Sequence, residues 1–157
     1  MVLLTTTSSR SSAATPCELW LPERERARLA AAAVAAYPRE ACGLLIGRIT
    51  VRAVEVVHIV VAANVAEEPQ RAFVVPAVTW FTATDWAAAN GLAVVGVWHA
   101  HPDGAAVPSA ADALAAWNDY ACVIVAVTRK KAGAPRAYWR QHGVLREQTV
   151  RATTRRA

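Results

Sequence analysis

The order of hydrophobic and polar residues along the chain predicts a mixture of strands and helices. Short apolar runs bounded by polar or turn residues indicate strands, and longer stretches that open with proline or contain alanine runs indicate helices. The predicted helices are Pro22–Tyr37, Pro76–Asn90 and Ser109–Trp117. The predicted strands are Leu19–Leu21, Ala41–Ile49, Val51–Ala63, Phe73–Val75, Ala93–Trp98, Cys122–Thr128, Arg136–Gln141 and Val144–Gln148.

This arrangement predicts an α/β or α+β domain in which helices pack against a sheet. Several strands are apolar throughout, as expected where both faces of a sheet are buried. Ala41–Ile49 and Val51–Ala63 are expected to form a hairpin, and the last two strands are expected to turn at His142-Gly143. The 157 residues suffice for one domain and are few for two.

The two ends of the chain differ from this domain in composition. Residues 1–16 are rich in threonine, serine and alanine and have no basic residue before their apolar patch. This composition predicts a disordered tail and not a signal peptide. Residues 150–157 predict a basic tail, which leaves residues 17–149 as the single domain.

The net charge of +5 is concentrated toward the C-terminal end, where nine lysines and arginines from residue 129 onward accompany a single acid, Glu147. A solvated surface explains such a patch, and docking of an acidic protein or a nucleic acid is the alternative. No nucleic-acid-binding motif accompanies the patch, so a nucleic-acid partner is not expected.

Cysteine usage and hydropathy predict a cytoplasmic protein. The three cysteines are widely spaced and form no Cys-x-x-Cys pair, so neither a disulfide framework nor a thiolate zinc site is expected. No apolar stretch reaches the length of a transmembrane helix without a charge or a break, so no membrane association is expected.

Candidate chemistry is concentrated in residues 99–112, which read HAHPDGAAVPSAAD. His99 and His101 lie two residues apart at the end of a predicted strand, so their side chains share one face. Proline and glycine then end the strand, and Ser109 and Asp112 open the next helix. Two imidazoles and one carboxylate leave the fourth tetrahedral position to water, which is the usual form of a catalytic zinc site.

A simpler interpretation competes for the same residues. Ser109 and Asp112 have the spacing of a helix capping box, and in isolation the pair favours that role. The two histidines just upstream favour metal ligation instead. We expect the two roles to exclude each other, because a carboxylate turned back toward the cap would face away from a metal ion.

Together with the segment Pro38–Gly47, this motif resembles the signature of the JAMM (MPN+) zinc metallopeptidases. That signature is a glutamate on an early strand, then His-x-His-Pro, six residues, serine, two residues and aspartate, and every spacing is matched here. The resemblance implies the MPN (JAB1) fold, a mixed sheet flanked by helices and related to the cytidine-deaminase fold. It implies one zinc ion with water as fourth ligand, held by His99, His101 and Asp112. It also implies Glu40 as general acid/base on the zinc-bound water and Ser109 as a donor to the oxyanion.

Within this resemblance the chain looks like the compact, stand-alone prokaryotic type. Only nine residues separate Asp112 from Cys122, which leaves no room for the insertion of relatives that select polyubiquitin linkages. The implied activity is hydrolysis of the peptide or isopeptide bond after the Gly-Gly tail of a ubiquitin-like or sulfur-carrier β-grasp protein. Alternatives are a RadC-like protein associated with DNA repair, a non-catalytic MPN scaffold, and a cell-wall or phage-tail peptidase.

The remaining candidate residues have ordinary interpretations. On its local sequence alone Glu40 is a solvated carboxylate at a loop edge, and its assignment rests on the family match. His58 and His142 are expected to be structural or exposed, and Cys42 to be a small buried hydrophobe instead of a redox-active thiol. The tryptophans that flank the motif, Trp98 and Trp117, are expected in the core instead of a substrate groove.

Overall fold

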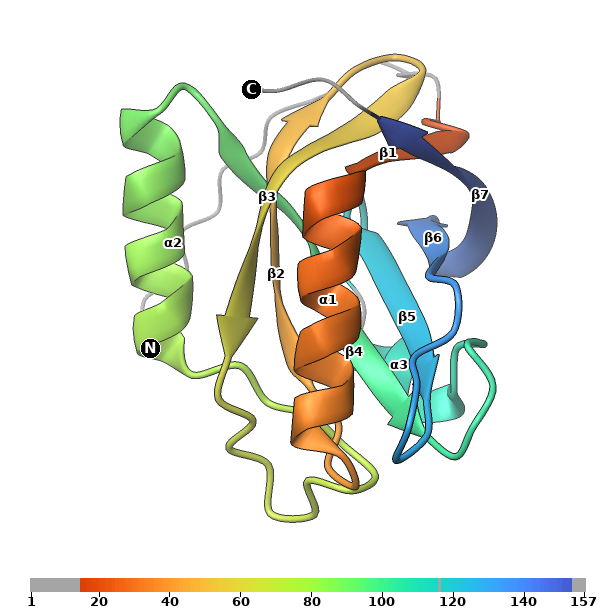
Figure 1. The fold of residues 1–157 in the computed structure, drawn as a ribbon. Helices are drawn as coiled ribbons and strands as arrows, with labels where there is room; N and C mark the ends of the chain where they lie inside the picture. Colours follow the sequence, from red (N-terminus) through yellow and green to blue (C-terminus); the bar gives the residue numbers. More distant parts are fainter. Residues whose placement is uncertain (1–14, 116, 154–157) are drawn as a thin grey trace.

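The computed structural model describes residues 15–115 and 117–153, which form a mixed α/β fold (Figure 1). The helices are α1 (Glu23–Ala36), α2 (Ala77–Ala89) and α3 (Ala110–Ala115). The strands are β1 (Glu18–Pro22), β2 (Cys42–Ile49), β3 (Ala53–Ala62), β4 (Ala93–Pro102), β5 (Ala121–Val127), β6 (Arg136–Gln141) and β7 (Val144–Thr153). The predicted fold class is therefore confirmed.

The strands join in the order β1-β3-β2-β4-β5-β6-β7, and the sheet closes because β1 pairs in parallel with both β3 and β7. Both predicted hairpins are present, since β2 pairs with β3 and β6 with β7 in antiparallel fashion. His142 (φ 51°) and Gly143 (φ 78°) form the second turn, and positive φ at both positions is typical of a type I′ turn. The closure itself was not predicted.

Strand β7 is longer than the sequence indicates. Its residues from Thr149 to Thr153 pair with β1, so residues 150–153, expected in a basic tail, belong to the barrel. The rest of that tail, like most of the expected N-terminal tail, lies outside the described residues. Two basic side chains of this end form ion pairs, Arg136 with Glu147 and Arg151 with Glu18, each with a nitrogen–oxygen distance of 2.7 Å.

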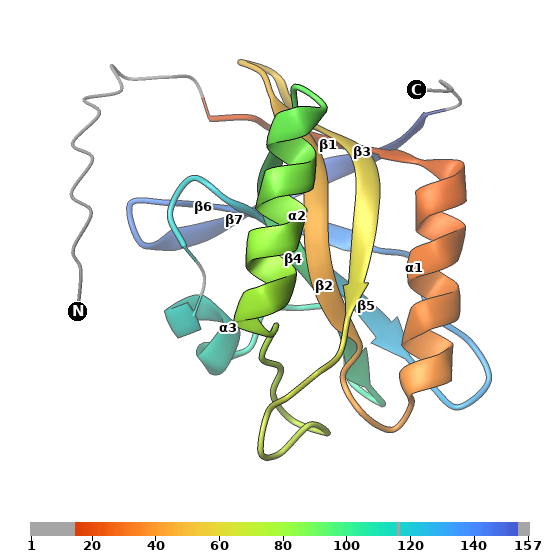
Figure 2. The same ribbon diagram turned by 90° about the vertical axis from the view of Figure 1, so that its left-hand side faces the viewer.

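Helices α1 and α2 cover opposite faces of β2 (Figure 2). Leu44 points into the cluster beneath α2, and Leu45, the next residue, points into the larger core beneath α1. This alternation follows from the two-residue period of a strand. Because β2 and β4 are covered on both faces, they are the apolar runs that the sequence predicts to be buried.

Gly43 allows β2, β3 and β4 to approach closely. A Cβ at this position would lie 1.8 Å from the carbonyl oxygen of Val60 and 2.5 Å from Nε1 of Trp98. The Trp98 indole is fully buried, and its Nε1–H donates to the Val60 carbonyl oxygen at 3.0 Å. The expected core position of Trp98 is confirmed, and this packing fixes the strand that carries the two histidines.

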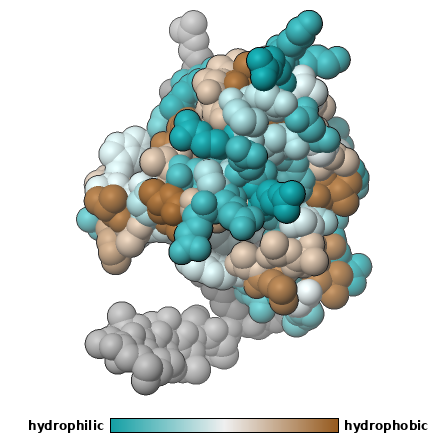
Figure 3. All heavy atoms as spheres, turned by 90° about the horizontal axis from the view of Figure 1, so that it is seen from below, coloured by the Kyte–Doolittle hydropathy of each residue, from teal (hydrophilic) through white to brown (hydrophobic). Residues whose placement is uncertain are grey.

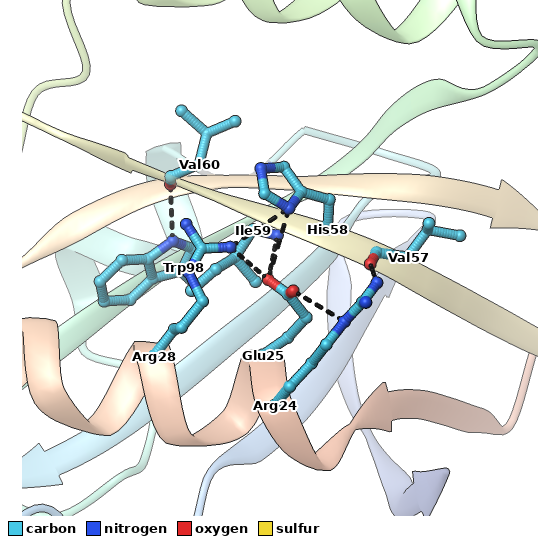
Figure 4. A network of polar contacts seen from close by, with 8 residues as sticks. All are labelled: Arg24, Glu25, Arg28, Val57, His58, Ile59, Val60 and Trp98. Atoms are coloured by element: carbon cyan, nitrogen blue, oxygen red, sulfur yellow. Dashed lines mark hydrogen bonds and ion pairs between the residues drawn. The ribbon is translucent and has the colours of Figure 1, made fainter. Parts of the chain in front are cut away.

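A buried carboxylate attaches α1 to β3 (Figure 4). Glu25 accepts the backbone N–H of Ile59 at 2.9 Å and a hydrogen bond from Arg28 at 2.7 Å, and Arg24 lies 3.3 Å from its second oxygen. Nδ1 of His58 lies 3.6 Å from the same carboxylate. His58 therefore belongs to a structural network on this face, as the sequence predicts.

The stretch Phe73–Val75, predicted to be a strand, pairs with no strand of the described chain. Hydrogen bonds to the preceding loop hold its middle residue, Val74, in place. Val74 N–H donates to the Asn64 side-chain oxygen at 3.1 Å, and the Val74 carbonyl accepts from Val65 N–H at 3.1 Å. A side-chain amide thus replaces a strand partner, which the hydrophobic pattern alone could not reveal.

Candidate metal centre

The three predicted ligands converge at the end of β4. The Nε2 atoms of His99 and His101 lie 2.9 Å apart. Asp112, from α3, places Oδ1 3.1 Å from His99 Nε2 and Oδ2 3.3 Å from His101 Nε2. One donor atom from each residue therefore faces a common point, and all of them lie within 4.8 Å of one another.

Both imidazole rings are held in place by neighbouring groups. His101 Nδ1 lies 2.8 Å from the Ala105 carbonyl oxygen, to which Nδ1–H donates, so the lone pair of a neutral ring is on Nε2. His99 is fully buried and stacks on Phe73, with ring centroids 4.5 Å apart. Its Nδ1 has no hydrogen-bond partner among the described residues. Both Nε2 atoms thus point to the same place as the carboxylate.

The Asp112 carboxylate also forms the helix cap. Ser109 N–H donates to Asp112 Oδ2 at 2.6 Å, and Asp112 N–H donates to Ser109 Oγ at 3.1 Å. The reciprocal pair is a capping box. The expectation that a capping carboxylate would face away from the two histidines was wrong, because the first turn of α3 faces the end of β4 and a carboxylate offers about four lone-pair sites.

The donor set fits zinc. Zinc–nitrogen and zinc–oxygen bonds of about 2.0–2.2 Å at tetrahedral angles separate neighbouring ligand atoms by about 3.3 Å. The two Nε2 atoms lie 2.9 Å apart, and each lies 3.1 or 3.3 Å from a different oxygen of the Asp112 carboxylate, so the three side chains lie at about the spacing of ligands to one ion. Two imidazoles and one carboxylate form a donor set that zinc commonly takes, and they leave one tetrahedral position open.

Strand register brings Glu40 to the same centre. Cys42 pairs with His99, and Ala100 N–H donates to the Ala41 carbonyl at 2.9 Å, so the next residue back along the chain, Glu40, lies opposite His101. Glu40 is 7% exposed. It is therefore not the solvated loop-edge carboxylate that its local sequence favours, because it lies where β2 begins against β4.

The backbone of Glu40 is fixed by the loop that follows β3. Its N–H donates to the Pro69 carbonyl at 2.6 Å, and its carbonyl accepts from Asn64 Nδ2 at 3.0 Å. Asn64 therefore connects Glu40 to the stretch that contains Phe73, which stacks on His99. No residue pattern pointed to Asn64, although asparagine is a common loop residue that bonds to nearby backbone.

The environment shifts the pKa values of the four groups in different directions. Burial raises the pKa of Glu40 to about 7, His101 acts to lower it, and Asp112 acts to raise it. Burial also acts to raise the pKa of Asp112, but hydrogen bonds with His101 and His99 outweigh it and hold that pKa below its usual value. Burial lowers the pKa of His99, and the hydrogen bond to Asp112 raises that of His101. At neutral pH the centre holds an ionised Asp112 beside a carboxyl group that titrates near 7.

Trp117 is not in the core, contrary to expectation. It is 58% exposed and lines a cavity of about 140 Å³ together with His99 and Asp112. Its ring lies 4.9 Å from that of Trp80 and 5.6 Å from that of Tyr120, centroid to centroid. Sequence reasoning missed this cavity, because its aromatic residues come from separate segments of the chain, and isolated aromatic residues are equally typical of a core.

The other candidate residues lie as expected. Cys42 is buried, and burial raises the pKa of its thiol to about 11, which suits a small hydrophobe. His142 is exposed in the β6–β7 turn.

The face that carries the loop between β3 and α2, at the bottom of Figure 1, is mainly hydrophilic in its middle and has separate hydrophobic groups toward its sides (Figure 3).

Residues 22–141 match the family described as prokaryotic homologs of the JAB domain, and the chain belongs to this family. The JAB family includes metallopeptidases. No protein among the curated ones matches the sequence. None of the helices in the described residues is long and apolar enough to cross a membrane.

Solved structures of three other proteins have a similar fold. A protein from Desulfitobacterium hafniense has a TM-score of 0.77 and 25% identity over 87% of this chain and 94% of its own. One from Salinibacter ruber has a TM-score of 0.65 and 29% identity over 85% and 90%. A JAB1/MPN domain protein from Archaeoglobus fulgidus has a TM-score of 0.51 and 19% identity over 87% and 98%, which shows the fold alone. The expected JAB/MPN fold is therefore confirmed.

Proposed function

We propose that this protein is a zinc-dependent peptidase or isopeptidase. Its proposed substrate is the bond that follows the C-terminal Gly-Gly tail of a ubiquitin-like or sulfur-carrier β-grasp protein. The observation that carries the proposal is the convergence of His99, His101 and Asp112 beside the buried carboxyl group of Glu40. The match to the prokaryotic JAB family supports it.

Each residue has a defined part in this reaction. His99, His101 and Asp112 would hold the zinc ion, which when bound makes water more acidic and polarises a carbonyl group. Hydrolysis adds the oxygen of water to the scissile carbonyl carbon, breaks the carbon–nitrogen bond and moves one proton to the leaving nitrogen. Glu40 is the group that accepts this proton and delivers it, because its buried carboxyl group lies opposite His101, at the edge of the centre.

Ser109 has a hydrogen to donate. Its Oγ accepts the N–H of Asp112, so the hydroxyl proton remains free for another acceptor. We assign it to the carbonyl oxygen of the substrate, where a donor stabilises the charge that develops in the transition state.

An extended tail finds backbone partners beside the centre. The described barrel is closed and offers no open edge strand, but the Phe73–Val75 stretch has unused groups. Val74 turns its N–H and carbonyl toward Asn64 and Val65, whereas those of Phe73 and Val75 have no partner in residues 15–115 and 117–153. A tail can add to such a segment by main-chain hydrogen bonds, and glycine allows the closest approach of two backbones.

Cleavage of a fusion protein tests the proposal. The substrate is a β-grasp protein whose Gly-Gly end is joined to a short peptide, and the released peptide is measured by mass spectrometry. The zinc-loaded protein should cleave after Gly-Gly, and Glu40→Gln should keep its zinc but lose about 10²- to 10⁴-fold in rate. Glu23→Gln, an exposed change at the start of α1, should cleave at the normal rate. An active Glu40→Gln protein would contradict the assignment.

A further inference from the structure

Beside the metal centre lies an apolar pocket of about 140 Å³. Its walls are mostly aromatic and aliphatic side chains: Phe73, Val75, Trp80, Val97, Trp117 and Tyr120. His99 and Asp112 form the wall that the pocket shares with the centre, and Asp112 is the only charged residue among the described residues of the lining. The pocket is therefore continuous with the metal ligands but apolar away from them.

The pocket and Glu40 lie on opposite sides of the centre along β4. Every second residue of a strand points to the same face, about 6.6 Å from the one before it. One face of β4 therefore carries Val97, His99 and His101. Val97 and His99 line the pocket but His101 does not, whereas Glu40 lies opposite His101. If Glu40 protonates the leaving nitrogen, as the proposed function requires, the leaving group lies on its side. The acyl part of the substrate then lies on the pocket side.

The size and the lining of the pocket define the chemistry of its occupant. Apolar cavities of about 150 Å³ in proteins bind benzene, so the space here suits a branched aliphatic or an aromatic side chain. Trp117 exposes 58% of its surface within the described structure, which leaves apolar ring surface for such a group to cover. Glycine could not fill the pocket, so its occupant must come from a residue before the Gly-Gly end.

We propose that this pocket binds an apolar side chain of the acyl tail, so the tail recognised carries a leucine-like or phenylalanine-like residue just before Gly-Gly. The two glycines have no side chain, so the third residue from the scissile carbonyl is the nearest one that could fill the pocket, and the fourth is the next. In an extended chain these two residues face opposite sides, so only one of them can enter the pocket. This inference rests on the proposed function for the direction of the substrate.

Binding of product peptides tests the pocket without any turnover. Acetyl-Leu-Leu-Gly-Gly and acetyl-Ser-Ser-Gly-Gly, both with free carboxylates, are titrated into the zinc-loaded protein by calorimetry. The leucine peptide should bind about 10- to 100-fold more tightly, because burial of one leucine side chain has an effect of this size. Mixed Leu-Ser and Ser-Leu peptides then assign the third or the fourth position.

Two variants of the same helix provide the matched comparison. Ala115 lines the pocket, and Ala115→Phe should fill it and abolish the preference for leucine. Leu114 is 86% exposed and is not in the lining, so Leu114→Phe should retain the preference. Equal binding of the two peptides by the unchanged protein, or an Ala115→Phe protein that still prefers leucine, would overturn the inference. If the two peptides bind equally but the fusion is still cleaved, the proposal for the pocket fails and the proposed function stands. If the leucine peptide is preferred but the fusion is not cleaved, the proposed function fails and the binding of an apolar side chain stands.

Discussion

Asp112 connects local folding to the chemistry of the centre. One carboxylate accepts Ser109 N–H at the start of α3 and lies 3.1 and 3.3 Å from the two imidazole Nε2 atoms. The short helix α3 is thereby tied to the end of β4 by the residue that would bind the metal. The sequence could suggest both roles of the Ser-x-x-Asp pattern, but only the geometry shows that the capping carboxylate also faces both histidines.

This double role leads to a prediction for Ser109→Ala. The variant loses the hydroxyl that accepts Asp112 N–H, so the free energy of unfolding of the metal-free protein should fall by about 1 kcal/mol in urea denaturation. Its zinc content should stay normal, because the Asp112 carboxylate remains. Asp112→Ala should lose both the cap and the zinc. Loss of zinc in Ser109→Ala would show that the cap is needed to place the carboxylate.

Burial of Glu40 predicts how the stability of the metal-free protein depends on pH. A carboxyl group whose folded pKa is about 7, above the ordinary 4.5, binds its proton more tightly in the folded state. Stability contributed by that proton is present below pH 4.5 and is lost as the pH rises through 7. The shift corresponds to at most about 3 kcal/mol.

Glu40→Gln should remove this loss, because the amide is neutral at every pH. In urea denaturation of the chelated protein, the variant should match the unchanged protein near pH 4.5 and be more stable above pH 7.5. Glu23→Gln, which is exposed on α1, serves as the control without such a difference. A Glu40→Gln protein that gains no stability at alkaline pH would contradict the buried position of the carboxylate.

At the scale of single elements, hydrophobic periodicity predicted most helices and strands, because β2, β4 and β5 are buried runs with polar ends. Hydrophobic periodicity gave a wrong prediction where an extended stretch has no neighbouring strand. Phe73–Val75 has a strand-like composition, but Asn64 takes the place of a neighbouring strand. Helix α3 ends at Ala115, before Trp117, whose position beside the pocket depends on contacts with Trp80 and Tyr120.

The close contact at Gly43 predicts a large effect of adding one methyl group. Gly43→Ala would place a Cβ 1.8 Å from the Val60 carbonyl oxygen, so the free energy of unfolding should fall by about 3 kcal/mol or more. Gly91→Ala is the matched control, because open space surrounds Gly91 and its φ of 66° costs alanine only about 1 kcal/mol. Similar losses for both variants in urea denaturation would contradict this packing.

At the scale of the whole molecule, closure of the barrel joins the two ends of the described chain. The pairs from Glu18–Thr149 to Pro22–Thr153 connect β1 to β7. The sequence could not show this closure, because four consecutive polar residues, 146–149, interrupt the pattern of β7 and its partner is more than 120 residues away. The candidate site was easier to predict, since three of its four key residues lie within fourteen positions of one another.

Closure predicts that the end of β7 contributes to stability. A chain that ends after Gln148 lacks the residues that pair with β1, and its Tm should fall by at least about 10 °C in thermal unfolding followed by circular dichroism. A chain that ends after Thr153 keeps every described pair and is the control. Equal Tm values for the two chains would show that β1 and β7 do not depend on each other.

The central claim is that His99, His101 and Asp112 hold a zinc ion on which Glu40 acts without being a ligand. Metal content measured by mass spectrometry of the purified, zinc-exposed proteins tests it most directly. The unchanged protein and Glu40→Gln should each hold about one zinc ion per chain, and His101→Ala should hold less than about one tenth of that. Equal zinc in all three proteins would contradict the metal centre.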